Sequence, residues 1–329
     1  MSKTILSRLR ESISQKPDAR KARLREAMSF LLFLSRCISR RGISVFFALL
    51  LLIVPIVTQA ATVAKPIKKD SYAAFTQALY SPSAAVQDVK SGAFLYQKDA
   101  NTQRPIASIS KVMTATVFLE TKPKLYNQIF YTNSSDRIGA TVPLRSGELI
   151  TLKQVLMGTL IPSANNMAVT LSKSTRLSEK QFIAQMNTRA KELGLKKTQF
   201  VEPTGLSAQN MSTANEISKL GRYAFQAHRK YFREAEMHRV YSYKTKNSGR
   251  VMNLYSTNKF NGHGTLELIA FKTGYLPGTA NRTLVAQIQQ KSTKKQVIVT
   301  LLGNPQYGTI FDEAERLANW SFANYNFPK

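Results

Sequence analysis

The chain has 329 residues and a formal net charge of +28, and 43% of its residues are hydrophobic. This hydrophobic fraction is typical of a folded protein and excludes a wholly disordered one. The single cysteine, Cys37, excludes an intramolecular disulfide. The three histidines lack metal-ligand spacing, so no metal site is expected. No other cofactor is expected either.

The N-terminal region contains an apolar run within residues 43–61. Three arginines, at positions 36, 40 and 41, precede the run, and the small residues of Thr58-Gln59-Ala60 follow it. This order is typical of a secretory signal peptide. Because residues 1–60 carry a long basic segment, two interpretations stay open: a peptide cleaved near Ala60, or a retained membrane anchor. Met28 is an alternative start. Both interpretations predict export to the periplasm or cell envelope.

The positive charge is not confined to this region. Residues 1–60 contain 11 Lys and Arg and 3 Asp and Glu, so 36 basic and 16 acidic residues remain and the exported part keeps about +20. A strongly basic surface often indicates nucleic acid as a partner, but export argues against it. Anionic polymers of the envelope are one alternative, and a solvated basic face without a specific ligand is the other.

Residues 61–79 are expected to form a linker and 80–329 a folded domain. Short apolar runs at 84–89 and 93–97 flank Lys90-Ser91-Gly92 and predict a β-hairpin. Residues 108–119 are apolar nearly all round. They predict a buried helix, with a buried strand pair as the alternative.

Three capping patterns predict helices in the middle of the chain: Thr151-x-x-Gln154, Ser178-x-x-Gln181 and Thr213-x-x-Glu216. The second helix is expected to stop at Gly194 and the third to extend through Ala227. Strands are predicted at 240–243, 251–255, 266–273, 283–289 and 296–302, and an amphipathic helix at 312–323. Because the last strands must pair with the first hairpin, the expected fold class is α+β, an antiparallel sheet packed against a helical cluster.

Three short motifs carry the candidate chemistry, and the first is Ser108-Ile109-Ser110-Lys111. Residues three apart on a helix are neighbours, so Ser108 and Lys111 are expected to meet. A serine hydroxyl needs a base to become a nucleophile, and a lysine is such a base when burial or positive neighbours lower its pKa. Two other Ser-x-x-Lys matches, beginning at Ser256 and Ser292, lie outside an apolar helix.

The second and third motifs are Ser163-Ala164-Asn165 and Lys272-Thr273-Gly274. The second follows Pro162 between two helical patterns, so a loop there can present both polar side chains to a cleft; taken alone, it is more typical of a helix N-cap. The third ends a predicted strand. Its lysine and threonine suit a carboxylate, and its glycine permits close approach of a substrate backbone. Taken alone, it is an exposed turn.

The ordered motifs resemble those of the serine D-alanyl-D-alanine carboxypeptidases and endopeptidases, the low-molecular-mass penicillin-binding proteins, which have a β-lactamase-like fold. Segments 105–115, 200–207 and 210–214 are similar to that family too, and the resemblance covers roughly residues 80–325. It implies that Ser108 is the nucleophile, Lys111 the general base and Ser163 the proton relay. It also implies an oxyanion hole from the backbone N–H groups of Ser108 and Tyr275, and substrate binding by Asn165, Lys272, Thr273 and Gly274.

The implied activity is hydrolysis of D-Ala-D-Ala or D-alanyl cross-link bonds in peptidoglycan stem peptides, with β-lactams as covalent inhibitors. Residues 80–329 would then be the catalytic domain. Only 55 residues follow Gly274, which makes the chain more similar to the single-domain, endopeptidase-type members.

The flanks of Lys272 depart from the family pattern, because Ile269, Ala270 and Phe271 stand where the family usually has Asp-Gly. Two alternatives stay open. One is a catalytically impaired peptidoglycan-binding module, which the large basic charge also suits. The other is a class A-like β-lactamase, in which Glu202 would be the deacylating carboxylate.

Overall fold

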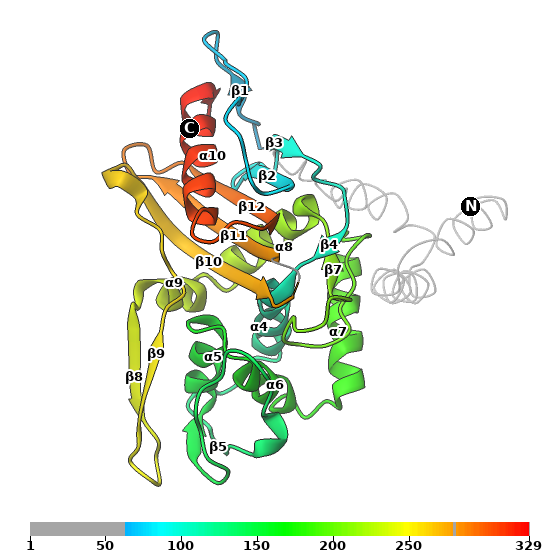
Figure 1. Cartoon of the computed structure of the whole chain (residues 1–329), viewed down its shortest axis with the longest axis vertical. Coiled ribbons are helices and arrows are strands. Elements are labelled where there is room, and N and C mark those ends of the chain that lie inside the picture. Colours follow the sequence, from blue (N-terminus) through cyan, green and yellow to red (C-terminus); the bar gives the residue numbers. More distant parts are fainter. Residues whose placement is uncertain (1–62, 279–280, 329) are drawn as a thin grey trace, which may run out of the picture. The chain divides into compact units, whose positions relative to one another are not determined.

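A five-stranded antiparallel sheet is the centre of the computed structural model, which describes residues 63–278 and 281–328 (Figure 1). Its strand order is β10-β11-β12-β2-β3. The bounds of the strands are β2 Ser83–Asp88, β3 Phe94–Lys98, β10 Leu266–Leu276, β11 Asn281–Gln290 and β12 Gln296–Asn304. Strand β12 pairs with β2, from Val297 opposite Asp88 to Leu302 opposite Ser83. The expected pairing of the last strands with the first hairpin is confirmed, and β10 is left at the edge of the sheet.

Helices cover both faces of this sheet. Helix α10, Ile310–Asn324, packs on one face, and helix α8, Ala214–Ala227, packs on the other, where α9, Arg229–Met237, contacts β10. Alternate residues along a strand point to opposite faces. Val285 therefore joins the core on the side of α8, whereas its neighbours Leu284 and Ala286 join the core under α10. The predicted α+β class is confirmed.

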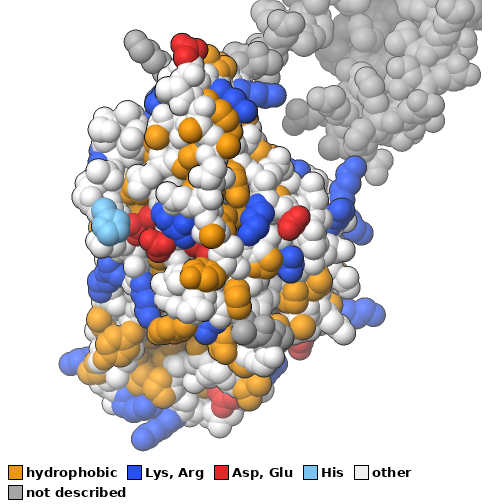
Figure 2. All heavy atoms as spheres, turned by 45° about the horizontal axis from the view of Figure 1, so that its top comes forward, with side chains coloured by type: hydrophobic (Ala, Val, Ile, Leu, Met, Phe, Trp, Pro, Cys, Tyr) orange, Lys and Arg blue, Asp and Glu red, His pale blue; other side chains and the backbone are white. Residues whose placement is uncertain are grey.

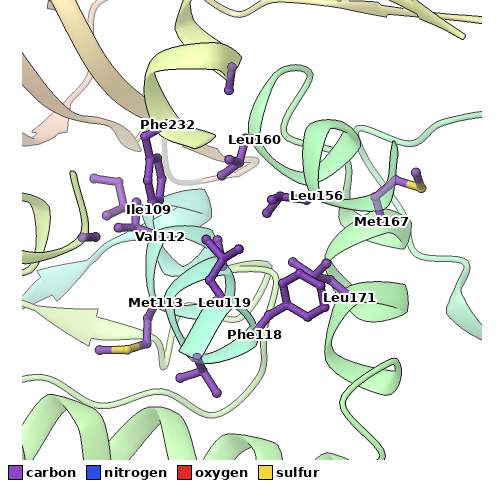
Figure 3. Packing of buried hydrophobic residues seen from close by; sticks show 14 of the residues in the cluster. Ile109, Val112, Met113, Phe118, Leu119, Leu156, Leu160, Met167, Leu171 and Phe232 are labelled. Carbon is purple, nitrogen blue, oxygen red and sulfur yellow. The ribbon is translucent and has the colours of Figure 1, made fainter. Parts of the chain in front are cut away.

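Helix α4, Ser110–Glu120, lies in the middle of the helical cluster. Every residue from 110 to 119 is buried, which explains why this segment is apolar on all sides. Figure 3 shows Val112, Phe118 and Leu119 of α4 among side chains of the surrounding helices. The other helices of the described residues are α5 Leu152–Leu160, α6 Asn165–Lys173 and α7 Glu179–Glu192.

The capping residues act largely as predicted. The Thr151 and Ser178 side chains each accept a hydrogen bond from the N3 backbone N–H, and the N3 glutamine side chain accepts one from the backbone N–H of the capping residue, so both are capping boxes. Gly194 follows α7 with a φ of +71°, a conformation that favours glycine. Thr213 caps α8 through the N–H of Glu216, but the Glu216 carboxylate accepts instead from the N–H of Lys197.

Several elements were not expected or pair differently. Strands β8, Val240–Lys244, and β9, Val251–Tyr255, form a separate two-stranded sheet. No bounds were predicted for helix α6 or for helix α9, although the Ser163 triplet was placed between two helical patterns. The remaining elements are short: β1 Ile67–Lys68, β4 Arg104–Pro105, η1 Ala107–Ile109, β5 Gln128–Phe130, η2 Asn133–Ser135, β6 Leu149–Thr151, β7 Met211–Ser212, η3 Gly262–Gly264 and β13 Tyr325–Asn326.

Residues 63–79, which were expected to form a linker, pack along α10. Trp320 donates its Nε1–H to the Ala73 carbonyl at 2.8 Å, and its ring contacts those of Tyr72 and Phe75 edge to face. Strand β1 pairs with β13 at the end of the chain. These contacts make the segment a strap on the domain, because its aromatic side chains bury apolar area there.

The predicted signal peptide or anchor, within residues 1–60, and the apolar run 43–61 lie outside the described residues. Among the helices that the structure describes, none has the length and hydropathy needed to cross a membrane. On the face of the described residues shown in Figure 2, Lys and Arg side chains are spread widely and outnumber Asp and Glu.

Candidate active site

A cleft of about 470 Å³ brings the three motifs together. Its lining comes from the Ser108 segment, the start of α6, the end of β10, the start of β11 and the start of α10, together with loop residues. The described residues that line it are Ser108, Gly139, Ala140, Pro162, Ser163, Asn165, Leu206, Thr257, Lys259, Thr273, Gly274, Tyr275, Pro277, Arg282, Thr283, Tyr307, Gly308, Ile310 and Phe311.

Ser108 lies in the 3-10 turn η1, immediately before α4. The preceding Ala107 has a φ of +50°, a left-handed conformation that costs an ordinary residue about 1–2 kcal/mol. Gly274 of β10 packs directly against this turn, since a Cβ on it would lie 2.9 Å from the Ser108 nitrogen. Close packing from the edge strand therefore holds the backbone of Ser108.

The side chain of Lys111 is fully buried at the centre of the site. Its Nζ lies 2.9 Å from the Ser108 Oγ, 2.7 Å from the Asn165 Oδ1 and 2.6 Å from the Thr204 carbonyl oxygen. The contact predicted from the spacing of three on a helix is present. The two additional acceptors fix the amine in front of the hydroxyl.

Burial lowers the pKa of Lys111 to about 7, while the charge of Glu202 acts in the opposite direction. A neutral amine beside a serine hydroxyl can accept its proton, which is the requirement for a general base. Lys272 is fully buried as well. Burial, together with the charge of Lys111, holds the pKa of Lys272 well below its usual range.

Ser163 and Asn165 face the cleft at the start of α6. Ser163 has a φ of +63°, and its buried Oγ has no hydrogen-bond partner among the described residues. The Asn165 side chain accepts from Lys111 and donates to the Ile138 carbonyl at 2.7 Å. Neither residue caps the helix, because Ala164 occupies the N-cap position without a side-chain bond. The interpretation of this triplet as an N-cap is wrong.

Lys272, Thr273, Gly274 and Tyr275 lie near the end of β10, at the sheet edge, rather than in an exposed turn. The Thr273 Oγ1 donates to the Thr257 Oγ1 at 2.8 Å, and the Lys272 Nζ donates to the Thr273 carbonyl at 2.8 Å. Phe271, which stands where the family usually has Asp-Gly, packs against Phe311 of α10 at a ring-centroid distance of 6.0 Å. Its aromatic ring is therefore part of the core beneath the cleft.

Segment 202–210 contacts the amine of Lys111, a contact that the three sequence motifs did not predict. The Thr204 carbonyl accepts from Lys111. The Glu202 carboxylate accepts from the N–H groups of Thr204 and Gly205, and from the Asn210 side chain. The resemblance of 200–207 and 210–214 to the family was the available signal, but it named no role for these residues.

The outer part of the cleft contains further residues without a predicted role, namely Thr257, Lys259, Arg282 and Tyr307. Two of them belong to the Ser-x-x-Lys match that begins at Ser256 and that was set aside for lack of an apolar helix. That match does lie beside the cleft. Its Lys259 is exposed, however, and donates to the Tyr307 hydroxyl.

Comparison with known proteins points to one family. The family model described as D-alanyl-D-alanine carboxypeptidase matches residues 70–306. Among curated relatives, a D-alanyl-D-alanine endopeptidase of Pseudomonas aeruginosa is 38% identical over 146 residues, which is 44% of this chain and 47% of the relative. One of Escherichia coli is 36% identical over 180 residues, 54% of this chain and 57% of the relative. The matches thus span about half the length of these two relatives.

A solved structure has a similar fold. The Streptomyces DD-transpeptidase superposes with a TM-score of 0.69 at 25% sequence identity, covering 76% of this chain and all of that one. The penicillin-binding type of fold expected from the motifs is confirmed.

Proposed function

Because the chain belongs to the D-alanyl-D-alanine carboxypeptidase family, we propose that it hydrolyses D-alanyl peptide bonds of peptidoglycan stem peptides through an acyl-enzyme on Ser108. One observation carries the proposal most directly. The Lys111 amine is buried, has a pKa of about 7 and lies 2.9 Å from the Ser108 hydroxyl. That is the arrangement a serine nucleophile with a lysine base requires.

In the first half of the reaction, the neutral Lys111 amine takes the proton of the Ser108 hydroxyl as its oxygen attacks the D-alanyl carbonyl. The backbone N–H groups of Ser108 and Tyr275 stabilise the oxyanion, and one such donor is worth about 10²–10³-fold in turnover. The proton then passes through Ser163 to the leaving nitrogen as the C–N bond breaks. An ester on Ser108 remains, and Lys111 is again neutral.

In the second half, water attacks this ester while Lys111 takes one of its protons. The C–O bond to Ser108 breaks, the serine recovers the proton, and the shortened peptide leaves with a new carboxylate. Lys272 and Thr273 would bind the carboxylate or amide of the substrate. A substrate carboxylate beside Lys272 favours its protonated form, which offsets the cost of burial.

The contacts of Lys111 argue against the non-catalytic alternative, because a binding module has no need of a buried amine held at its serine. Glu202 argues against a class A-like β-lactamase. Its carboxylate is held by Thr204, Gly205 and Asn210, and the described lining of the cleft contains no glutamate.

Digestion of purified muropeptides tests the proposed activity. We expect loss of terminal D-Ala, loss of cross-linked dimers, or both, and none of these with Ser108→Ala. Similarity to two endopeptidases makes dimer cleavage the expected main activity. Wild-type protein that leaves pentapeptides and dimers intact would overturn the proposal.

We propose further that the chain is exported, on the basis of the signal-peptide pattern in residues 43–61. Membrane association through this segment would follow if it is retained. Mass spectrometry of the protein recovered from the cell envelope tests both points: a new N-terminus near residue 61 indicates cleavage, and intact residues 43–61 indicate an anchor. Recovery from the cytoplasm alone would contradict export.

A further inference from the structure

Two cations and two aromatic rings form a cluster at the outer end of the cleft: Lys259, Tyr275, Arg282 and Tyr307, called here the outer cation cluster. The guanidinium of Arg282 lies over both rings, 4.9 Å from the Tyr275 centroid and 5.4 Å from the Tyr307 centroid. It also donates to the Pro305 carbonyl at 2.9 Å. Stacking and this hydrogen bond hold the guanidinium in one orientation, so less entropy is lost when it binds an anion.

Lys259 contributes the second positive charge. Its Nζ donates to the Tyr307 hydroxyl at 2.9 Å and lies 4.7 Å from the centre of that ring. The same tyrosine thus contacts both cations. Two like charges held on one ring repel each other, and an anion bound between them would offset that repulsion.

Neither cation has an acidic partner among the residues that the structure describes. The ion pairs of the described residues involve neither Lys259 nor Arg282, and the described lining of the cleft contains no Asp or Glu. Many basic side chains of a highly positive chain have no acidic partner. These two differ because they converge on one tyrosine inside the cleft that contains the nucleophile.

The cluster is joined to the catalytic part of the cleft at two points. Arg282 lies opposite Tyr275 in the register of β10 and β11, and Tyr275 supplies one expected oxyanion donor. Lys259 follows Thr257 by two residues, and Thr257 accepts the hydrogen bond of Thr273. Under the proposed function, Thr273 holds the carboxylate next to the scissile amide, on the leaving side. The cluster therefore continues the site on that side.

We propose that the outer cation cluster binds a second carboxylate, carried by the leaving part of the substrate. This rests on the proposed function and narrows its substrate class. The preferred leaving group is an acidic residue or peptide, as released from a cross-link, rather than a single neutral D-amino acid. Carboxylates are the anions that a peptide substrate carries, and an arginine fork matches their geometry.

Two synthetic peptides test the inference, acyl-D-Ala-D-Glu and acyl-D-Ala-D-Gln, whose leaving residues have the same shape and differ by one negative charge. For the wild type, we expect kcat/KM to be roughly tenfold higher for the D-Glu peptide, as for a hydrogen bond to a charged group. Most of the difference should lie in KM. The preference should weaken in high salt because the cluster is partly exposed.

Variants test whether the outer cation cluster causes the preference for the D-Glu peptide. Arg282→Gln and Lys259→Gln should each reduce the ratio severalfold, and the double variant should bring it close to one. Arg282→Lys keeps the positive charge and should retain part of the preference for the D-Glu peptide. Arg229→Gln and Lys219→Gln remove the same charges from exposed positions outside the cleft, and both should keep the wild-type ratio.

Three results would overturn the inference. A wild-type ratio near one, with both peptides hydrolysed, would refute it while leaving the proposed function intact. A preference that survives in the double variant would place the recognition elsewhere. Failure of the wild type to cleave these peptides and acyl-D-Ala-D-Ala would refute the proposed function, and this inference with it.

Discussion

Gly205 approaches Ala107 so closely that a Cβ on the glycine would lie 1.9 Å from the Ala107 carbonyl oxygen. The same Cβ would lie 2.7 Å from the Ser108 nitrogen. The segment that carries Glu202 and Thr204 therefore packs against the backbone of Ser108 with no room for a side chain. Because Thr204 also accepts a hydrogen bond from Lys111, the positions of Lys111 and Ser108 depend on each other through this segment.

Gly205→Ala should disable the site. The substitution combines the clash at Ala107 with a φ of +85°, so the two segments must move apart. We expect acylation of Ser108 to slow by at least tenfold and thermal stability to fall. Gly147→Ala is the matched control, since Gly147 has a φ of +86° with nothing within 4 Å. The control variant should lose only the free energy of backbone strain, roughly 1–2 kcal/mol of stability. If Gly205→Ala is acylated as fast as the wild type, the proposed packing constraint is refuted.

The acylation rate should rise with pH through the pKa of Lys111. The protonated amine cannot accept the serine proton, so the rate falls below pH 7 and levels off above it, because the pKa of Lys111 is about 7. Stopped-flow measurement with a chromogenic β-lactam gives this profile. Lys111→Ala should lose both the rate and the pH dependence. A wild-type midpoint near the ordinary lysine value of about 10.4 would contradict a buried, neutral base.

Asn165→Asp tests the same amine from the other side. The Asn165 Oδ1 lies 2.7 Å from the Lys111 Nζ, so an ionised carboxylate there would favour the protonated amine. The midpoint of the acylation profile should move upward by at least about one pH unit, with a lower rate at pH 7. Asn165→Ala removes the acceptor without adding charge and should not raise the midpoint. An unchanged midpoint in the aspartate variant would exclude the contact in the active enzyme.

How much of the fold and of the site could be predicted from the sequence depends on how far apart in the chain the interacting residues lie. Local signals were reliable: the capping boxes at Thr151 and Ser178 form, and Lys111 meets Ser108 across one helical turn. The pairing of β12 with β2 followed from the need to complete one sheet. The capping role considered for Ser163 and Asn165 at the start of helix α6 was wrong, because Ala164 occupies the N-cap position and the side chain of Asn165 is bonded to Lys111.

The unpredicted parts of the site depend on long-range contacts. Thr204 meets Lys111 from 93 positions away, and Arg282 and Lys259 approach Tyr307 from separate elements. No local pattern encodes such a meeting. The strap at 63–79 was expected to be a linker for the same reason, since its partner, Trp320, lies near the other end of the chain.

Trp320→Ala should destabilise the domain without removing its chemistry. The indole packs edge to face against Tyr72, Phe75, Tyr96 and Tyr325 and bonds to the strap. Loss of the indole should lower the free energy of unfolding by about 2–4 kcal/mol, measured by urea unfolding followed by circular dichroism. Trp320→Phe keeps an aromatic ring but loses the hydrogen bond to Ala73, so its free energy of unfolding should fall by about 1 kcal/mol. A change below about 0.5 kcal/mol in the alanine variant would show that the strap adds nothing to stability.

Covalent labelling with a fluorescent penicillin is the most direct test of the central claim, that Ser108 and Lys111 form an acyl-transfer site. The wild type should form a stable adduct at Ser108, located by mass spectrometry of the labelled peptide. Ser108→Ala should form none, and Lys111→Ala should label at least about 100-fold more slowly. A wild type that is not labelled, or a label that persists in Ser108→Ala, would contradict the account.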